Sequence, residues 1–272
     1  MTEVRAKKYL GQHFLTDLGV ARAISETLPV GTGMAVLEIG PGMGVLTQYL
    51  AQTHGELLTA IEIDQESVEY LAQNLSQVRV VEGDFLKMDL DKIVPDGRPF
   101  MVIGNYPYNI SSQIFFRILE YRDRIPVCSG MIQKEVAERI AAAPGSKTYG
   151  ITSVLLQAFY DIEYLFTVHE NVFNPPPKVK SAVIRLTRNK RQSLGCDERL
   201  FIEIVKRAFN QRRKTMRNSL RPLLTERIQN DDIFNRRPET LSVNEFISLT
   251  NLISNELCPN SEYTTAIMAA SK

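Results

Sequence analysis

The chain has 272 residues, of which 44% are hydrophobic and 23% charged, and its formal net charge is +1. These values are ordinary for a globular protein with a buried core, and the length suits two domains of roughly 100–200 residues better than one. The sequence also argues against a membrane-spanning protein, because no apolar run approaches the roughly 20 residues that cross a bilayer.

The N-terminus and the cysteines both favour a cytoplasmic protein. The opening sequence MTEVRAKKYLGQ has basic residues without an apolar segment after them, so we expect no secretory signal. Three cysteines, Cys128, Cys196 and Cys258, lie far apart without the paired spacing of a metal site. We therefore expect reduced thiols, no bound metal and no membrane association.

From about residue 34, short apolar runs alternate with helical patterns. Continuously apolar strands that alternate with helices indicate a parallel sheet covered on both faces, so the sequence predicts an α/β fold. Two later apolar runs follow each other without a helix between them, which predicts an antiparallel pair at the end of the sheet. The expected strands are 34–39, 57–63, 78–81, 100–103, 127–132, 163–168 and 181–187, and the expected helices among the first five are 45–53, 66–75 and 110–121.

The composition changes after Arg188, where NKRQSLGCDE reads as a linker. We place a domain boundary there, with one domain at 1–190 and a second, helical domain at 191–272. The turn-rich segment 143–150 is expected to be a mobile loop, and the tail after Pro259 is expected to be frayed. The helices expected in the second domain are 198–209, 212–220 and 243–257.

The first candidate site is Glu38-Ile-Gly-Pro-Gly-Met-Gly44, between a predicted strand and a predicted helix. Glycines let a backbone approach a ligand closely, and a helix start offers free N–H groups. Glu62 ends the next strand, where an acid can accept hydrogen bonds from both ribose hydroxyls of a nucleoside. Asp84 ends the third strand, where it can accept from an adenine amine while Phe85 covers the base.

Two classes of nucleoside cofactor fit this edge of the sheet, nicotinamide dinucleotides and S-adenosylmethionine. Dinucleotide sites have the spacing G-x-G-x-x-G and bind a pyrophosphate at the helix N-terminus. Here the spacing is G-x-G-x-G, and Glu38 just before it would repel a pyrophosphate but tolerate a cationic sulfonium. The electrostatics favour S-adenosylmethionine.

The second candidate site is Asn105-Tyr-Pro-Tyr108, which follows the fourth strand at the same edge. An adenine amine is a poor nucleophile because its lone pair is delocalised into the ring. The side-chain oxygen of Asn105 and the main-chain oxygen of Tyr106 can accept hydrogen bonds from the N–H groups of this amine. These bonds favour a tetrahedral nitrogen, in which the lone pair is available for attack. Pro107 restricts the residue before it to an extended conformation, and Tyr108 offers a face for stacking, worth roughly 1–3 kcal/mol.

The segment 206–221 carries seven Lys or Arg and no acid, although the net charge of the chain is close to zero. Such a cluster predicts contacts with phosphates, which supply affinity but little sequence reading. Lys7, Lys8 and Arg5 are candidates for a second contact. The expected RNA-binding residues are Arg212, Arg213, Lys214, Arg217 and Arg221.

Taken together, these motifs resemble the adenosine dimethyltransferases that modify small-subunit ribosomal RNA. Gly11-Gln-His-Phe-Leu15 is similar to the N-terminal motif of that family, EIGPGMG to its cofactor loop, and NYPYNIS to its catalytic motif, usually NLPYNIS. The segments VFNPPPKV and FNQRRKTMRNSL complete a resemblance that covers nearly the whole chain. Tyr106 stands where the family usually has Leu, and we expect activity to be retained because only its carbonyl is required.

The resemblance implies a Rossmann-like class I S-adenosylmethionine-dependent methyltransferase sheet with a small C-terminal all-helical domain. It implies transfer of two methyl groups to each of two adjacent adenosines in a hairpin near the 3′ end of the RNA, within an immature small subunit, with S-adenosylhomocysteine as product. The implied catalytic residues are Asn105, Tyr106, Pro107, Tyr108 and Phe173, with Tyr108 and Phe173 on either side of the target base. The implied cofactor-binding residues are His13, Leu15, Gly40, Gly42, Glu62, Asp84 and Asn105.

Three alternatives remain open. The resistance enzymes that methylate large-subunit RNA are near relatives, but NPPPKVKSAVIRL and the segment 209–220 argue against them. A non-catalytic assembly factor is disfavoured by the intact Asn105 and Glu62, although one protein can have both roles. A nicotinamide oxidoreductase is disfavoured by the glycine spacing.

Overall fold

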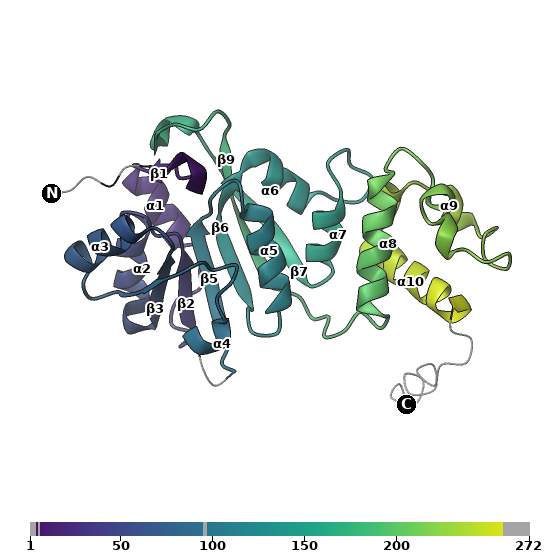
Figure 1. Ribbon diagram of the computed structural model, residues 1–272, viewed down its shortest axis with the longest axis horizontal. Helices are drawn as coiled ribbons and strands as arrows, with labels where there is room; N and C mark the ends of the chain where they lie inside the picture. The colour runs from purple at the N-terminus through teal and green to yellow at the C-terminus, as the bar shows by residue number, and fades with distance from the viewer. Residues whose placement is uncertain (1–3, 5, 95–96, 258–272) are drawn as a thin grey trace. The chain divides into compact units, whose positions relative to one another are not determined.

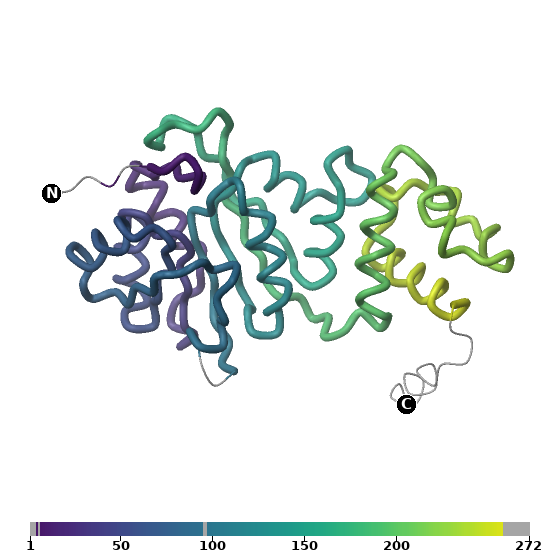
Figure 2. The backbone as a smooth tube through the Cα atoms, in the orientation of Figure 1, coloured from purple at the N-terminus to yellow at the C-terminus, as the bar shows by residue number. Residues whose placement is uncertain are grey.

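A computed structural model describes residues 4, 6–94 and 97–257 of the chain. Its packing divides the chain into two compact units. The first, called here the sheet unit, comprises Met1–Glu138 and Tyr160–Asn189, and the second, the helical unit, comprises Arg139–Phe159 and Lys190–Lys272. The path of the chain through each unit can be followed in Figures 1 and 2.

The sheet unit is built on a seven-stranded sheet in the order β4-β3-β2-β5-β6-β9-β7. The first five strands in this order are parallel, and β9 pairs antiparallel with both β6 and β7. The predicted α/β fold and the antiparallel pair at the end of the sheet are therefore confirmed. The strands are β2 (Ala35–Ile39), β3 (Leu58–Glu62), β4 (Arg79–Glu82), β5 (Phe100–Asn105), β6 (Val127–Gln133), β7 (Tyr160–Val168) and β9 (Ser181–Arg188).

Strand β2 lies where the direction of the strand order changes. The chain passes from β2 to β3 and β4 on one side and then returns to form β5 on the other side of β2. In open α/β sheets, ligands bind outside the carboxyl ends of the strands at such a reversal. The carboxyl ends of β2 and β5 lead directly into the two motifs that the sequence analysis selected, at Gly40 and Asn105.

The core of the sheet unit joins helices to the central strands through side chains that are fully buried. Ile24 of α1 and Leu50 of α2 belong to one hydrophobic cluster with Val36 of β2 and Met101 of β5. Continuous apolar runs are needed in these strands because both faces of the sheet are covered. The helices are α1 (Leu18–Ser25), α2 (Thr47–His54), α3 (Gln65–Asn74), α4 (Leu90–Ile93), α5 (Ser111–Glu120) and α6 (Lys134–Ala141), the last of which crosses from the sheet unit into the helical unit.

A second, two-stranded sheet joins segments that are far apart in the sequence. Strand β1 (Phe14–Leu15) pairs antiparallel with β8 (Phe173–Asn174). Each strand has two residues, which is too short for the alternation by which a strand is recognised in a sequence. This pairing brings the N-terminal motif and the NPPP segment together.

The helical unit consists of α7 (Ile151–Gln157), α8 (Glu198–Asn210), α9 (Met216–Ser219) and α10 (Val243–Leu257), with short connecting turns. Phe209 lies between Tyr149 and Phe246, with ring centroids 6.1 Å and 6.0 Å away. The unit differs from the predicted range 191–272 because it includes Arg139–Phe159. Four residues of α7, from Ser153 to Leu156, are buried, and the fully buried Tyr149 lies in the segment that the sequence analysis expected to be a mobile loop.

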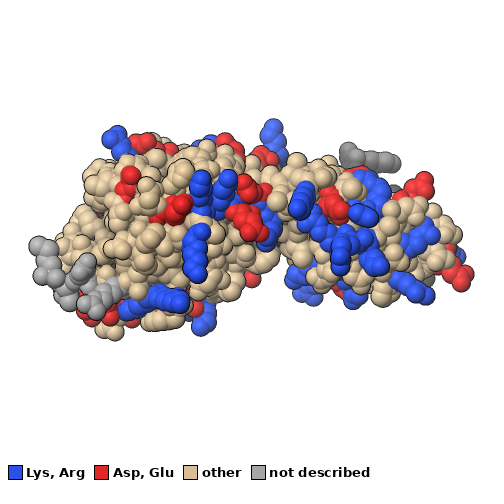
Figure 3. Space-filling view, turned by 90° about the horizontal axis from the view of Figure 1, so that it is seen from above, with Lys and Arg blue, Asp and Glu red and all other residues tan. Residues whose placement is uncertain are grey.

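The predicted helix 212–220 is helical only from Met216 to Ser219, and its first part is a turn. Helix α8 ends at Asn210, Lys214 donates its N–H to the carbonyl of Gln211, and α9 begins only at Met216. Three successive cations offer no apolar side chain to bury, whereas Thr215 has the extended backbone of a residue that precedes a helix. Lys and Arg side chains gather on one face of the helical unit (Figure 3).

Some expectations lie outside the described residues, namely those for Arg5, for Cys258 and for the tail after Pro259. Cys128 and Cys196 are both free thiols. In the part of the chain that the structure describes, no helix combines the length and the hydropathy needed to cross a membrane.

Helix α8 begins after Asp197, whose carboxylate accepts a hydrogen bond of 2.8 Å from the N–H of Leu200. We expect Asp197→Ala to lower the free energy of unfolding by about 1 kcal/mol, because an N–H of the first turn loses its acceptor. Asp197→Asn keeps an acceptor and should have a much smaller effect. Chemical denaturation followed by circular dichroism measures both, and equal losses in the two variants would show that the cap does not stabilise the helix.

Candidate functional site

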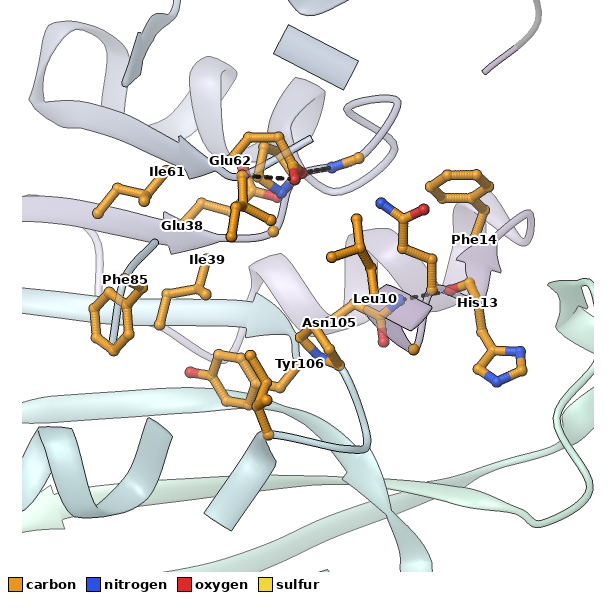
Figure 4. A pocket seen from close by; sticks show the side chains of 18 of the residues that line it. Leu10, His13, Phe14, Glu38, Ile39, Ile61, Glu62, Phe85, Asn105 and Tyr106 are labelled. Carbon is orange, nitrogen blue, oxygen red and sulfur yellow. Dashed lines mark hydrogen bonds between the residues drawn. The ribbon is translucent and has the colours of Figure 1, made fainter. Parts of the chain in front are cut away.

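A cavity of about 290 Å³ lies at the carboxyl edge of the sheet (Figure 4). It is lined by the residues that follow β2, β3, β4 and β5, and by the N-terminal segment from Tyr9 to Leu15. Every predicted cofactor-binding residue and four of the five predicted catalytic residues line it: His13, Leu15, Gly40, Gly42, Glu62, Asp84, Asn105, Tyr106, Pro107 and Tyr108.

The glycine loop has a conformation that needs glycine. Gly42 has φ +54°, and a Cβ added to it would lie 3.0 Å from the ring of Phe14. Its N–H donates to Oε2 of Glu62 at 3.0 Å. The loop is thus closed against β3 at one end and against the N-terminal segment at the other.

Glu62 is buried and holds the loop through its carboxylate. Its Oε1 accepts from the N–H groups of Ile63 and Asp64, both at 2.9 Å, in addition to the bond that Oε2 accepts from Gly42. Burial raises the pKa of Glu62, and these three N–H groups oppose the rise. A carboxylate has about four acceptor positions, so capacity for a ligand hydroxyl remains.

Glu38 is a second buried acid at the cavity, with 1% of its surface exposed. Burial raises its pKa to about 8, and the charge on Glu62 acts in the same direction. Within the described residues, neither its Oε2 nor the hydroxyl of Thr47 has a hydrogen-bond partner. A buried carboxyl with one oxygen lacking a hydrogen bond favours a ligand that is cationic or donates hydrogen bonds.

Asp84 and Phe85 occupy the end of the cavity next to β4. Asp84 accepts from the N–H of Leu86 at 3.0 Å, and Lys87 lies 3.4 Å from its other oxygen. The ring of Phe85 is 4% exposed. The two residues form a wall with one acceptor and one aromatic surface.

The N-terminal segment is attached across the glycine loop by polar contacts. Lys7 forms ion pairs with Asp64 and with Glu66, and Gln12 donates to Asp64 at 3.4 Å. Burial by itself would raise the pKa of Asp64, but the hydrogen bonds from Lys7 and Gln12 bring it below its ordinary value. Lys7, which the sequence analysis assigned to RNA, is therefore engaged within the protein.

The same segment orients the catalytic motif. The side-chain NH₂ group of Asn105 donates to the main-chain oxygen of His13 at 3.1 Å (Figure 4). Nδ1 of His13 donates to the carbonyl of Pro175 at 2.8 Å, and its ring lies 5.3 Å from the ring of Tyr108. With its NH₂ group held in this way, the amide of Asn105 has its oxygen available on the opposite edge.

Two contacts at the motif were not predicted. The hydroxyl of Tyr108 forms a short hydrogen bond with the hydroxyl of Ser181, and the ring of Tyr108 lies beside that of His13. The partners come from β9 and from the N-terminal segment, which the order of residues in the sequence does not bring together. No local pattern could have revealed these contacts.

Phe173 is the predicted site residue that the structure does not bring to the cavity. It is 4% exposed and belongs to the hydrophobic core, where β1–β8 pairing sets it opposite Leu15. The expectation that Phe173 and Tyr108 lie on either side of a base stays a prediction, and in the structure the side chain of Phe173, the first residue of β8, packs into the core. His13 is the ring that lies beside Tyr108.

Some of the predicted RNA-binding side chains are exposed to solvent, and others form hydrogen bonds within the protein. Arg213, Lys214 and Arg221 are exposed. Arg212 donates to the carbonyl of Ser146 at 3.2 Å, and Arg217 donates to Asn235 at 2.9 Å. The first three are therefore the stronger candidates for phosphate contacts. Within residues 4, 6–94 and 97–257, no group of His, Cys, Asp or Glu has the arrangement of a metal site.

The chain is similar to known RNA methyltransferases along nearly its whole length. It is 60% identical over 254 residues to "Ribosomal RNA small subunit methyltransferase A" of Phocaeicola vulgatus, covering 92% of this chain and 90% of the relative. It is also 60% identical over 261 residues to the protein of the same name from Bacteroides thetaiotaomicron, covering 94% and 97%.

Solved structures agree in fold. A dimethyladenosine transferase from Plasmodium falciparum has a TM-score of 0.76 at 23% identity, covering 90% of this chain and 98% of that one. The 23S rRNA methyltransferase ErmE has a TM-score of 0.67 at 26% identity, covering 88% and 99%.

The family predicted from the motifs is confirmed by a model of that family. The model described as "Ribosomal RNA adenine dimethylase" matches residues 3–255. With this match and the identity to the bacterial relatives, the chain belongs to the ribosomal RNA adenine dimethylase family.

Proposed function

We propose that the protein transfers methyl groups from S-adenosylmethionine to the exocyclic amines of two adjacent adenosines in a hairpin near the 3′ end of small-subunit ribosomal RNA. The observation that carries this proposal is the amide of Asn105, whose NH₂ group is held by the His13 carbonyl at the edge of the cavity. The side-chain oxygen of Asn105 is then available to accept a hydrogen bond from the target amine. The bacterial relatives, named for the small subunit, support this RNA over the large-subunit RNA named for ErmE.

The cavity residues fit S-adenosylmethionine, which supplies an activated methyl group when it is bound. Glu38 would face the cationic part of the molecule, because Oε2 of its buried carboxyl lacks a hydrogen bond among the described residues. Glu62 would accept from a ribose hydroxyl, Asp84 would accept from the adenine amine, and Phe85 would cover the adenine. Gly40 and Gly42 let the backbone come close to the amino-acid end, beside His13 and Leu15.

The reaction needs an amine nitrogen that can attack the methyl carbon of the cofactor. The protein supplies two oxygens that can accept hydrogen bonds from this amine. Oδ1 of Asn105 and the carbonyl of Tyr106 would accept these hydrogen bonds and favour a tetrahedral nitrogen. Asn105 and Tyr106 would hold the amine with its lone pair directed at the methyl group of the bound cofactor, S-adenosylhomocysteine would be the product, and the displaced proton of the amine would leave for solvent. Positioning and polarity, rather than a strong base, account for the acceleration.

Tyr108 would stack on the target adenine, which contributes roughly 1–3 kcal/mol. The adenine must leave its own stack to enter the site, and this costs a few kcal/mol. The ring of His13 lies beside that of Tyr108, so we infer that it moves aside or faces the entering base.

The exposed cations of the helical unit would bind the RNA backbone. Arg213, Lys214 and Arg221 lie in a stretch that lacks acids, and structured RNA is recognised mostly by shape and phosphate contacts. We infer that the substrate is RNA within an immature small subunit in the cytoplasm, and that methylation accompanies maturation of that particle.

Unmethylated small subunits incubated with methyl-labelled cofactor test the proposal, followed by mapping of the labelled nucleotides. We expect label on two adjacent adenosines of the small-subunit RNA and none on large-subunit RNA. Asn105→Ala should lower the transfer rate at least about 100-fold, as removal of one positioned donor or acceptor does at other enzymes, with cofactor binding largely kept. Label on large-subunit RNA, or near-normal transfer by Asn105→Ala, would contradict the proposal.

The raised pKa of Glu38 predicts that cofactor binding releases a proton. At pH 7 Glu38 should be mostly protonated in the empty cavity, because its pKa is about 8, and a bound cation should favour the ionised form. Cofactor binding should therefore release up to about one proton more from the natural protein than from Glu38→Gln. Calorimetric titration at pH 7, in buffers with different ionisation enthalpies, counts these protons. Equal counts would show that no cation lies beside Glu38.

Replacement of Arg213, Lys214 and Arg221 by Ala should weaken binding to the small subunit and reduce the slope of log affinity against log salt concentration. Each lost phosphate contact reduces the slope by about 0.7–0.9. Binding measured at several salt concentrations gives the slope directly.

The control for this experiment removes the same charge elsewhere, by Ala at the exposed residues Lys92, Lys190 and Arg199. We expect the slope to be nearly unchanged in the control. If the two triple variants had the same slope, the turn between α8 and α9 would not be part of the RNA contact.

A further inference from the structure

Tyr106 lines the cavity together with Asn105 and Pro107, but its side chain is buried against the sheet. Its ring is 1% exposed and lies beside two glycines, Gly104 of β5 and Gly130 of β6, which are paired across the sheet. A Cβ added to Gly104 would lie 2.8 Å from the ring, and one added to Gly130 would lie 2.6 Å from it. The ring therefore occupies space that exists only because both positions are glycine.

Both ends of the residue are fastened to β6. Its N–H donates to the carbonyl of Met131 at 3.0 Å, and its hydroxyl donates to the carbonyl of Ser129 at 2.7 Å. The ring also meets the edge of Phe115, with centroids 5.9 Å apart. These attachments fix the main chain of Tyr106, and its carbonyl is the second hydrogen-bond acceptor in the proposed function.

A proton-transfer role for this hydroxyl is excluded by its surroundings. Burial raises the pKa of Tyr106 well above its ordinary value, and the nearby thiol of Cys128, 3.3 Å from the hydroxyl, acts in the same direction. The phenol stays neutral at pH 7, and its proton is donated to the carbonyl of Ser129. Any effect on the reaction must therefore come from position.

We propose that the side chain of Tyr106 is a positioning residue for methyl transfer in this protein, which revises the expectation that only its carbonyl matters, because here the ring fills the space beside Gly104 and Gly130. It holds the backbone from Asn105 to Pro107 so that the Asn105 amide and the Tyr106 carbonyl keep a fixed separation at the cavity. This inference rests on the proposed function, because it concerns the two acceptors named there. A leucine at this position would fill only part of the space beside the glycines and could not donate to Ser129.

The variants Tyr106→Leu and Tyr106→Phe test the proposal in the full-length protein, with unmethylated small subunits as substrate. Displacement of a reacting group by about 1 Å can lower a rate about 100-fold, and this is the fall in kcat that we expect for Tyr106→Leu. Tyr106→Phe loses only one hydrogen bond, so its kcat should fall about 2–10-fold. The KM for the particle and the Kd for the cofactor should stay within about two-fold, since only the transition state is affected.

Tyr160→Phe is the matched control. Tyr160 is also 1% exposed, and its hydroxyl donates to the carbonyl of Ile125 at 2.9 Å, away from the cavity. The control loses the same type of buried hydrogen bond and should keep its kcat. An equal fall in kcat for Tyr106→Phe and Tyr160→Phe would overturn the proposal, since the effect would then be one of general stability.

A second measurement does not depend on RNA. The side-chain NH₂ signals of Asn105 in a nitrogen-edited NMR spectrum are identified by their loss in Asn105→Asp. In Tyr106→Leu we expect them to shift or broaden as the hydrogen bond to His13 loosens, and in Tyr160→Phe to stay unchanged. Unchanged signals in Tyr106→Leu, or in Tyr106→Phe if the leucine variant does not fold, would overturn the proposal. A natural protein that does not methylate the particle would instead refute the proposed function.

Discussion

The site depends on the position of β2, which pairs with β3 on one side and with β5 on the other. The strands that follow β2 in the chain are added first on one side of it, as β3 and β4, and then on the other side, as β5 and β6. The loops that follow β2 and β5 therefore diverge and leave a crevice at the carboxyl edge. The glycine loop occupies one wall, and the Asn105 motif occupies the other. Chemistry that joins a cofactor to a second substrate needs such a crevice between two rigid strands.

Buried acids give this crevice its electrostatic character. Glu62 is compensated by three backbone N–H groups, whereas Glu38, equally buried, has an oxygen with no partner among the described residues. An uncompensated carboxyl destabilises the empty protein, since burial disfavours its charged form. The same carboxyl would be stabilised by a cationic ligand.

The N-terminal segment closes the third side of the cavity and connects its parts. Its main chain accepts from Asn105, Lys7 and Gln12 contact Asp64, and β1 pairs with β8. These links couple the glycine loop, the catalytic motif and the NPPP segment through a few polar bonds. The inward position of Phe173 and the ring contact between His13 and Tyr108 both follow from this arrangement.

The amino-acid sequence by itself determined the elements with a strong period and the residues at their ends. The runs that became β2, β3, β5 and β6 are continuously apolar because both sheet faces are covered, and the motifs at Gly40, Glu62 and Asn105 follow from strand ends that a parallel sheet brings to one edge. Only the tertiary structure decided which of the other predicted residues meet. Arg139–Phe159 joined the helical unit because α7 buries an apolar face there, and the turn at 212–215 interrupted a helix that propensity alone favoured. The directions of Phe173, Tyr106 and His13 depend on contacts with residues far away in the chain, and local periodicity contains no information about such contacts.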